Sequence, residues 1–213
     1  MIKTKRRGLL YVVSGPSACG KDTIVRKLLE RRKDIWLSIS CTSRSPRPAE
    51  KDGVDYFFIT KDEFETKIEN QEFLEYAKYA DNYYGTPLEN IEKHLNMGQD
   101  VILIIEIQGA LQIKKALPET LFIFILPPSM KELKRRIENR GTEDKEKINK
   151  RFLRAYEEIN EVNKYNYVVV NDDLDLAVNK VEAILISEKC RVDRIEEIDV
   201  DNIEEEIHEA LVK

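Results

Sequence analysis

The sequence predicts an α/β fold in which a mostly parallel β-sheet is flanked by helices. Short apolar runs alternate along the chain with segments whose apolar residues recur at helical spacing, the order expected of strand–helix–strand units. One run, Val101–Ile107, is apolar at nearly every position, as a strand covered on both faces would be. With 213 residues, the chain can bury a core without a disulfide or a metal, and one domain with an insert fits that length.

The first elements lead into a glycine-containing loop. Gly8–Val13 has the length and apolar character of a buried strand, and Ser14–Gly20 has the composition of a loop. The next segment, Lys21–Arg32, places its apolar residues on one helical face. Trp36–Cys41 is then expected to form a second, short strand.

The segment from about 38 to 86 interrupts this alternation, because it is richer in short strands and aromatic residues. Its first part is polar, contains Pro46 and Pro48, and is expected to form a loop. A strand, a short helix, and an aromatic-rich strand and turn are expected after it, at Tyr56–Ile59, Lys61–Asn70 and Phe73–Tyr84. We interpret this segment as an insert over the ligand-binding edge of the sheet.

The second half of the chain returns to alternating helices and strands. The expected strands are Val101–Ile107, Leu121–Leu126 and Tyr167–Val170. The expected helices are Leu88–Met97, ended by Gly98, then Gly109–Leu117, a helix from the capping residue Ser129 to about Arg140, Lys145–Lys164 and Leu174–Lys189.

The final segment, 190–213, is acidic. From Asp193 to Lys213, nine acidic residues stand against two basic ones. Its large aliphatic residues recur at three- to five-residue steps, which approximates a helical stripe, and they are Ile195, Ile198, Ile203, Ile207 and Leu211. A helix packed on its own domain is the preferred interpretation and a dimerisation helix the alternative, so we expect a monomer or a homo-oligomer.

Composition excludes several classes of protein. Hydrophobic residues make up 42% of the chain, and no apolar run approaches the roughly 20 residues of a membrane span. The three cysteines form no CxxC pair, which favours reduced thiols in the cytoplasm. Outside residues 193–213 the net charge is only +2, without the basic excess of a nucleic-acid-binding protein. We therefore expect a cytoplasmic protein whose partners include neither a membrane nor a nucleic-acid polymer.

The strongest functional signal is the loop between the first strand and the first helix. It reads Gly15-Pro16-Ser17-Ala18-Cys19-Gly20-Lys21-Asp22-Thr23. Two glycines and a lysine between a strand and a helix are typical of a phosphate-binding loop, whose backbone N–H groups and helix N-terminus bind phosphate oxygens. Lys21 would bridge the terminal phosphates of a nucleotide. An ordinary glycine turn is the alternative, and the strand–loop–helix context argues against it.

Two positions depart from the usual form of this loop. Asp22 stands where a serine or threonine commonly helps to hold Mg²⁺, and it could contribute to Mg²⁺ binding or point away from the site. Ala18 replaces a common glycine, and a positive φ there would cost about 1 kcal/mol. We interpret Cys19, also in the loop, as an inert small side chain.

A second candidate phosphate site follows in the insert. Arg44 and Arg47 lie three residues apart beside prolines, which makes a rigid cationic fork for a phosphate, although a solvated charged loop is the commoner outcome for such a sequence. The tyrosines of the insert could stack on a base or contact a phosphate. The carboxylate of Glu75 can accept two hydrogen bonds, as the N1–H and N2–H₂ edge of guanine would donate.

Together these motifs make the sequence resemble guanylate kinases, which transfer the γ-phosphoryl group of ATP to GMP. The resemblance runs from about Gly8 to Lys189. It is carried by Ser-Gly-Pro-Ser at 14–17, Ser-x-x-x-Arg-x-Pro-Arg at 40–47, Asn-Tyr-Tyr-Gly at 82–85, Gln-Gly at 108–109, Arg-Gly-Thr-Glu at 140–143 and Val-Asn-Asp-Asp at 170–173. It implies a phosphate-loop nucleoside monophosphate kinase fold spanning 1–189, with a core of 1–37 and 87–189, a small mixed GMP-binding insert at about 38–86 and a lid at about 138–150.

The resemblance also implies roles for individual residues. The GMP-binding residues would be Ser40, Arg44, Arg47, Glu50, Tyr56, Glu75, Tyr84, Thr86 and Glu106. The ATP-binding residues would be the whole loop from Gly15 to Thr23, with Arg136 and Asn171. The catalytic residues would be Lys21, Arg44, Arg140 and Arg151. Mg²⁺ would accompany ATP, with Asp22 as a candidate ligand, and GMP or dGMP would be the acceptor.

Two residues between the implied nucleotide sites depart from the family pattern. Glu106 replaces an aspartate and Ile104 replaces an acidic residue. Both departures affect the geometry with which Mg²⁺ would be bound. Three alternatives stay open: a kinase for another small phosphorylated acceptor, a phospho-ligand-binding module without catalysis, and a nucleotide hydrolase that acts as a switch. The departures at Asp22, Ile104 and Glu106 keep the second of these open. The base-reading residues argue against the first, the intact Lys21 loop against the second, and the lack of an Asn-Lys-x-Asp string against the third.

Overall fold

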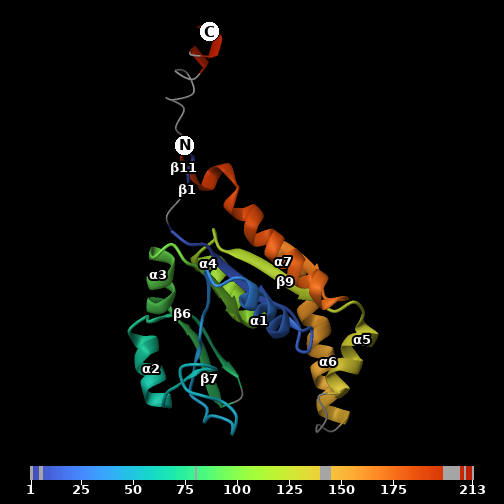
Figure 1. The fold of residues 1–213 in the computed structure, drawn as a ribbon. Coiled ribbons are helices and arrows are strands. Elements are labelled where there is room, and N and C mark those ends of the chain that lie inside the picture. The colour runs from blue at the N-terminus through green and yellow to red at the C-terminus, as the bar shows by residue number, and fades with distance from the viewer. Residues whose placement is uncertain are drawn as a thin grey trace.

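A five-stranded parallel sheet forms the centre of the structure, which is a computed structural model (Figure 1). The residues described are 2–4, 7–79, 81–139, 145–198, 207–208 and 210–212. The strand order is β10-β9-β2-β8-β3, with bounds Tyr167–Val170, Leu121–Leu126, Leu10–Ser14, Asp100–Ile104 and Ile35–Leu37. Because β2 pairs in parallel with both β8 and β9, the loop after it emerges at the middle of the carboxyl edge of the sheet.

Helices cover both faces of this sheet. Side chains of β2 alternate between the two faces, so Tyr11 and Val13 enter one buried cluster while Leu10 and Val12 enter another. The first cluster is closed by α1 (Lys21–Arg31) and α7 (Leu174–Lys189), and the second by α3 (Leu88–Asn96) and α4 (Ile107–Ala116). This alternation confirms a sheet that is buried on both faces.

A small mixed sheet and one helix form the part of the chain between residues 41 and 87. The sheet has the order β5-β4-β7-β6, with bounds Phe57–Phe58, Cys41–Thr42, Asn82–Pro87 and Phe73–Tyr79. The helix α2 (Lys61–Glu69) begins at a capping box formed by Thr60 and Glu63. It packs on the sheet through Phe64, whose ring stacks on those of Phe73 and Tyr83 at centroid distances of 4.3 and 5.2 Å.

Two further helices lie on the opposite side of the core from the small sheet (Figure 1). They are α5 (Met130–Asn139) and α6 (Lys145–Ile159). The Oγ of Ser129 accepts a hydrogen bond from the backbone N–H of Glu132 at 3.1 Å, which confirms the predicted cap of α5. The two helices share a small apolar cluster with the phosphate loop, built from Ala18, Leu133, Ile137 and Ala155.

Most predicted elements are confirmed to within two residues at each end. The expected strand and turn Phe73–Tyr84 is a pair of strands, β6 and β7, and the second runs on to Pro87. Three further boundaries were wrong. The expected strand Trp36–Cys41 is divided, because the chain leaves the core sheet after Leu37 and enters the small sheet at Cys41. The apolar run Val101–Ile107 continues past β8 into the first residue of α4, since strand and helix start both face the core. The last helix expected before β10 ends at Ile159, and a short 3-10 turn, η1 (Val162–Lys164), follows it.

The acidic tail does not begin as a helix. After a 3-10 turn, η2 (Val192–Arg194), the residues Ile195–Ile198 form β11, which pairs antiparallel with β1 (Ile2–Thr4). The expected packed helix is therefore wrong here, because Ile195 and Ile198 lie in a strand that pairs with the N-terminal segment. Ile203 lies outside the described residues, while Ile207 and Leu211 are 51% and 80% exposed.

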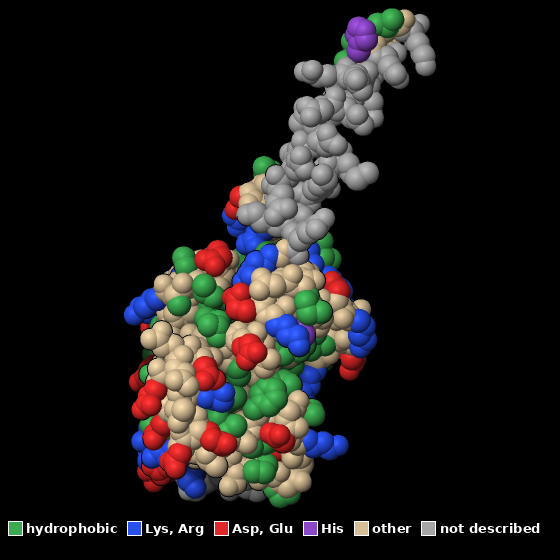
Figure 2. All heavy atoms as spheres, turned by 90° about the vertical axis from the view of Figure 1, so that its left-hand side faces the viewer, with side chains coloured by type: hydrophobic (Ala, Val, Ile, Leu, Met, Phe, Trp, Pro, Cys, Tyr) green, Lys and Arg blue, Asp and Glu red, His purple; other side chains and the backbone are tan. Residues whose placement is uncertain are grey.

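The surface carries mixed charge. On the face turned toward the viewer in Figure 2, acidic and basic side chains lie side by side among hydrophobic ones. In the described part of the chain, none of the helices has both the length and the apolar character that a membrane span requires.

Candidate active site

The loop after β2 wraps the N-terminus of α1, as the sequence predicts. The Nζ of Lys21, whose side chain is buried, donates to the carbonyl of Gly15 at 3.4 Å, so the ammonium group folds back over the loop. Gly20 has φ of 94°, and a Cβ there would lie 2.3 Å from Nδ2 of Asn171. Glycine is therefore required twice over, for the left-handed backbone and for the close approach of the amide.

Ala18 adopts the conformation that its glycine-like position suggested. Its φ is 67°, in the left-handed region that costs an alanine about 1 kcal/mol. Its methyl group lies in the buried cluster with Leu133 and Ile137 of α5, and this contact offsets part of that strain.

Three side chains from distant elements hold the phosphate loop in place. Asn171, just after β10, donates from Nδ2 to the carbonyl of Cys19 at 2.8 Å, and Arg136 of α5 donates to the same oxygen at 3.4 Å. Arg136 also donates to the carbonyl of Asn171 at 3.2 Å. Arg151 of α6 donates to the Oγ of Ser17 at 2.7 Å. Arg136 and Asn171, predicted for the ATP side, are thus bonded to the loop and to each other. Within the loop, the backbone N–H of Cys19 donates to the carbonyl of Pro16 at 3.1 Å.

A cavity of about 390 Å³ opens beside the loop. Its lining residues are Ala18, Gly20, Thr23, Arg136, Asn171, Asp172 and Leu174.

Cys19 is buried, and burial raises the pKa of its thiol, so the prediction of an inert side chain is supported.

Asp22 is exposed in the first turn of α1, directly after the loop. Among the described residues, no group of three or more acidic, histidine or cysteine side chains could enclose a metal ion. Mg²⁺ keeps several water ligands and binds chiefly through nucleotide phosphates in kinases. One exposed carboxylate beside a phosphate loop therefore fits an ion carried by the nucleotide.

The second candidate phosphate site is organised by one carboxylate. Glu50 accepts two hydrogen bonds from the guanidinium group of Arg44, at 2.6 and 2.7 Å, and a third from the backbone N–H of Arg47 at 2.8 Å. These bonds lower the pKa of Glu50 to about 2. The Arg44 guanidinium also lies 5.0 Å from the ring centroid of Tyr56, whose ring meets that of Tyr84 edge-on at 6.1 Å.

Four of the predicted GMP-site residues therefore form one cluster, Arg44, Glu50, Tyr56 and Tyr84. Arg47 joins it through its backbone, while its side chain is exposed.

The predicted base-reading residues lie on the same small sheet. Glu75 of β6 and Thr86 of β7 are cross-strand partners, and both are buried. The Thr86 hydroxyl donates to Oε1 of Glu75 at 2.5 Å. Burial raises the pKa of Glu75, and the Thr86 hydrogen bond opposes this shift. Ser40 is half-buried just before β4, where its carbonyl accepts from the backbone N–H of Phe57 at 2.9 Å.

Sequence reasoning missed Arg154 and Glu158, two residues on the side of α6 that is turned toward Glu106. Arg154 lies 3.3 Å from Oε2 of Glu106 and donates to Oε1 of Glu158 at 2.9 Å. Its guanidinium group also lies 5.3 Å from the ring centroid of Tyr79 in β6, so it joins α6, the core and the small sheet. Glu158 is largely buried, and burial followed by the charge of Glu106 raises its pKa. The four-residue spacing of Arg154 and Glu158 was a visible signal for this pair.

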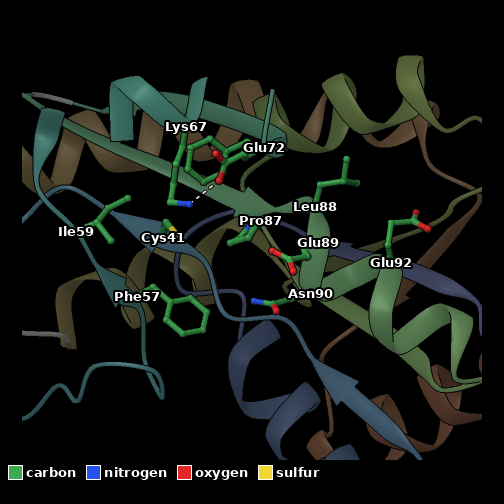
Figure 3. A pocket seen from close by; sticks show the side chains of 11 residues that line it. Cys41, Phe57, Ile59, Lys67, Glu72, Pro87, Leu88, Glu89, Asn90 and Glu92 are labelled. Atoms are coloured by element: carbon green, nitrogen blue, oxygen red, sulfur yellow. Dashed lines mark hydrogen bonds and ion pairs between the residues drawn. The ribbon is translucent and has the colours of Figure 1, made fainter. Parts of the chain in front are cut away.

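A larger and more apolar cavity, of about 540 Å³, lies behind the small sheet and contains none of the predicted site residues (Figure 3). The ion pair between Lys67 and Glu72, at 2.5 Å, crosses one end of it. Cys41 faces it, and burial raises the pKa of that thiol to about 11.

Arg140, predicted as catalytic, lies outside the described residues, as do residues 141–144 of the predicted lid.

Taken together, a phosphate loop at the centre of a parallel sheet, a second candidate phosphate site in the insert beside it, and a buried carboxylate on the small sheet match an α/β phosphate-loop kinase of the nucleoside monophosphate class. Comparison with known proteins gives the family. The family model for guanylate kinase matches residues 7–188. The chain belongs to the guanylate kinase family.

Individual relatives agree with this assignment. The chain is 60% identical over 190 residues to the guanylate kinase of Caldanaerobacter subterraneus subsp. tengcongensis, covering 89% of this chain and 92% of that protein. It is 54% identical over 210 residues to the guanylate kinase of Clostridium perfringens, covering 99% and 97% of the two chains. The crystal structure of guanylate kinase from Anaplasma phagocytophilum superposes with a TM-score of 0.75 at 34% identity, covering 92% and 93%. The resemblance inferred from the motifs is confirmed.

Proposed function

We propose that this chain transfers the γ-phosphoryl group of ATP to GMP, and to dGMP, giving ADP and the corresponding diphosphate. The observation that carries the choice of acceptor is the buried Glu75 carboxylate, with Thr86 bonded to Oε1. Guanine presents two adjacent donors, N1–H and N2–H₂, to such a group, whereas the equivalent edge of adenine presents an acceptor at N1. Membership of the guanylate kinase family supports the same acceptor.

On the donor side, the phosphate loop binds ATP phosphates through its backbone N–H groups. Lys21 supplies a cation at the terminal phosphates, and its weak contact with the Gly15 carbonyl leaves the ammonium group able to turn toward a ligand. Arg136 and Asn171 both donate to the Cys19 carbonyl, so this loop oxygen already has its hydrogen-bond partners. The donors for the anion would be the backbone N–H groups at the N-terminus of α1.

On the acceptor side, Glu50 orients Arg44 and the Arg47 backbone for the GMP phosphate. A guanidinium group already held by a carboxylate loses less side-chain entropy when it binds phosphate. Tyr56 and Tyr84 complete this side with their hydroxyl groups. Glu106, at the N-cap of α4, would lie between the two nucleotides.

Phosphoryl transfer requires in-line positioning and cationic stabilisation of the moving group. Lys21, Arg44 and Arg151 supply the positive charge from three different elements, and Arg140 would add a fourth. Mg²⁺ bound with ATP would neutralise phosphate charge, with Asp22 the candidate protein contact. Residues 1–37 and 87–189 act as the core, about 38–86 as the GMP-binding insert, and about 138–150 as a lid that excludes water.

Phosphorus NMR tests the reaction directly. With ATP, GMP and Mg²⁺, the γ-phosphorus signal of ATP should fall at the same rate as a GDP β-phosphorus signal grows. Growth of inorganic phosphate instead would indicate a hydrolase. No change alongside measurable GMP binding would indicate a phospho-ligand-binding module.

A further inference from the structure

Gly109 occupies the first turn of α4, where it faces the base-reading carboxylate. It is buried and is the third residue of the helix, after Ile107 and Gln108. A Cβ placed on it would lie 2.4 Å from Oε2, 2.9 Å from Cδ and 3.4 Å from Cγ of Glu75. All three nearest atoms belong to one side chain, so the space that glycine leaves at this position is occupied by Glu75.

The strand that carries Glu75 cannot move aside easily. Gln112, one turn further along α4, donates to the carbonyl of Tyr76 at 3.0 Å and accepts from the backbone N–H of Tyr76 at 3.4 Å. These bonds fix β6 against α4 one residue after Glu75. Any group added at Gly109 must therefore displace the carboxylate itself and not the strand.

The first turn of α4 also favours an ionised carboxylate. The first three N–H groups of a helix have no acceptor within the helix, and they give this end a partial positive charge. The first intrahelical bond here runs from the N–H of Ala110 to the carbonyl of Glu106. This partial charge favours the ionised form of Glu75, against the burial that raises its pKa.

We propose that Gly109 is a specificity-determining positioning residue, whose missing side chain lets the Glu75 carboxylate lie against the first turn of α4 in the orientation that reads guanine. The inference rests on the proposed function through the role of Glu75. Gly109 does not touch the base; it sets where Oε2 stands while Thr86 holds Oε1.

The variant Gly109→Ala tests this, because its backbone has no left-handed φ and alanine favours a helix over glycine by about 1 kcal/mol. We expect the thermal midpoint to stay within about 4 °C of the wild type. GMP affinity measured by titration calorimetry should fall at least tenfold, equal to about 1.4 kcal/mol. ATP affinity should stay within twofold. The exposed Lys115→Ala on the same helix is the matched control and should change neither affinity.

A double-mutant cycle with Glu75→Ala separates positioning from general damage. Once Glu75 is shortened, the space beside Gly109 is free, so adding Gly109→Ala should cost GMP affinity less than twofold more. An equal loss in both backgrounds, or unchanged GMP affinity in Gly109→Ala alone, would overturn the proposal. Gly109→Ala could also lower the thermal midpoint strongly. In that case, adding Glu75→Ala should raise the midpoint again, which would support the proposal. A midpoint that stays low in the double variant would overturn it.

The readout is binding, so it does not depend on turnover. A wild-type chain that binds GMP without phosphorylating it would refute the proposed function, and the cycle would still decide the role of Gly109. If the chain is an active kinase and its GMP affinity is the same in the wild type and in Gly109→Ala, this inference alone is refuted.

Discussion

Replacing Thr86 by valine removes one hydrogen bond from a buried carboxylate while keeping the shape of the side chain. Thr86 is fully buried, and its hydroxyl donates to Oε1 of Glu75 at 2.5 Å. A hydrogen bond to a charged group contributes about 1.5–3 kcal/mol. Thr86→Val should therefore lower the free energy of unfolding by about that amount, and the thermal midpoint by roughly 3–12 °C in a chain of this size.

The penalty should depend on pH with a definite sign. Burial raises the pKa of Glu75 in the folded state, so the ionised carboxylate costs stability at neutral pH, and this cost is relieved as pH falls through the folded pKa. The Thr86 hydrogen bond opposes the shift, so removing it raises the pKa further. Thr86→Val should consequently destabilise the fold more at pH 7.5 than at pH 5.

Urea unfolding at the two pH values, with GMP titrations alongside, measures both effects. We expect GMP affinity to fall about tenfold, because the remaining carboxylate is no longer held in one orientation. A loss below about 0.5 kcal/mol, within the range of ordinary surface substitutions, would refute the argument that this bond organises the base site. An equal loss at both pH values would refute the assignment of the effect to Glu75.

Other substitutions separate the parts of the site. Lys21→Ala should lower kcat on the order of 10²–10³-fold with little change in GMP affinity, and an unchanged kcat in steady-state assays would remove the lysine from the reaction. Glu50→Gln should raise the KM for GMP about tenfold by releasing Arg44, and leave the KM for ATP within twofold; because the pKa of Glu50 is about 2, the wild-type pair should persist at every pH above about 4. Thr60→Ala removes the cap of α2 and should cost about 1 kcal/mol of stability in thermal unfolding, and a matching loss of kcat would contradict a purely structural cap.

The core of the fold could be predicted because its signals are local. The runs that became β9 and β10, and the stripe that became α7, have the predicted bounds without change. The strand Val101–Ile107 was extended too far because a buried strand and a buried helix start are equally apolar, so periodicity cannot separate them. The tail was misread because spacings of three to five residues also fit a short strand, and its partner β1 lies almost 200 residues earlier in the chain.

The candidate site was partly predictable for a related reason. The phosphate loop is a contiguous motif, so its residues were found together. Arg154 and Glu158 were missed because their role depends on which face of α6 meets Glu106, and this is set by tertiary packing. The space that Gly109 leaves for Glu75 likewise arises only when α4 and β6 pack together.

The most direct test of the central claim is a coupled ADP-release assay with ATP, Mg²⁺ and each of GMP, dGMP, AMP, CMP and UMP. The buried Glu75–Thr86 pair predicts strong turnover with GMP and dGMP, and kcat/KM for the other three lower by at least about 10³-fold, because a site built to bond a substrate's donors rejects bases that lack them. Comparable turnover with AMP would contradict the base-reading role of this pair. Absence of turnover with all five monophosphates would contradict the kinase assignment itself.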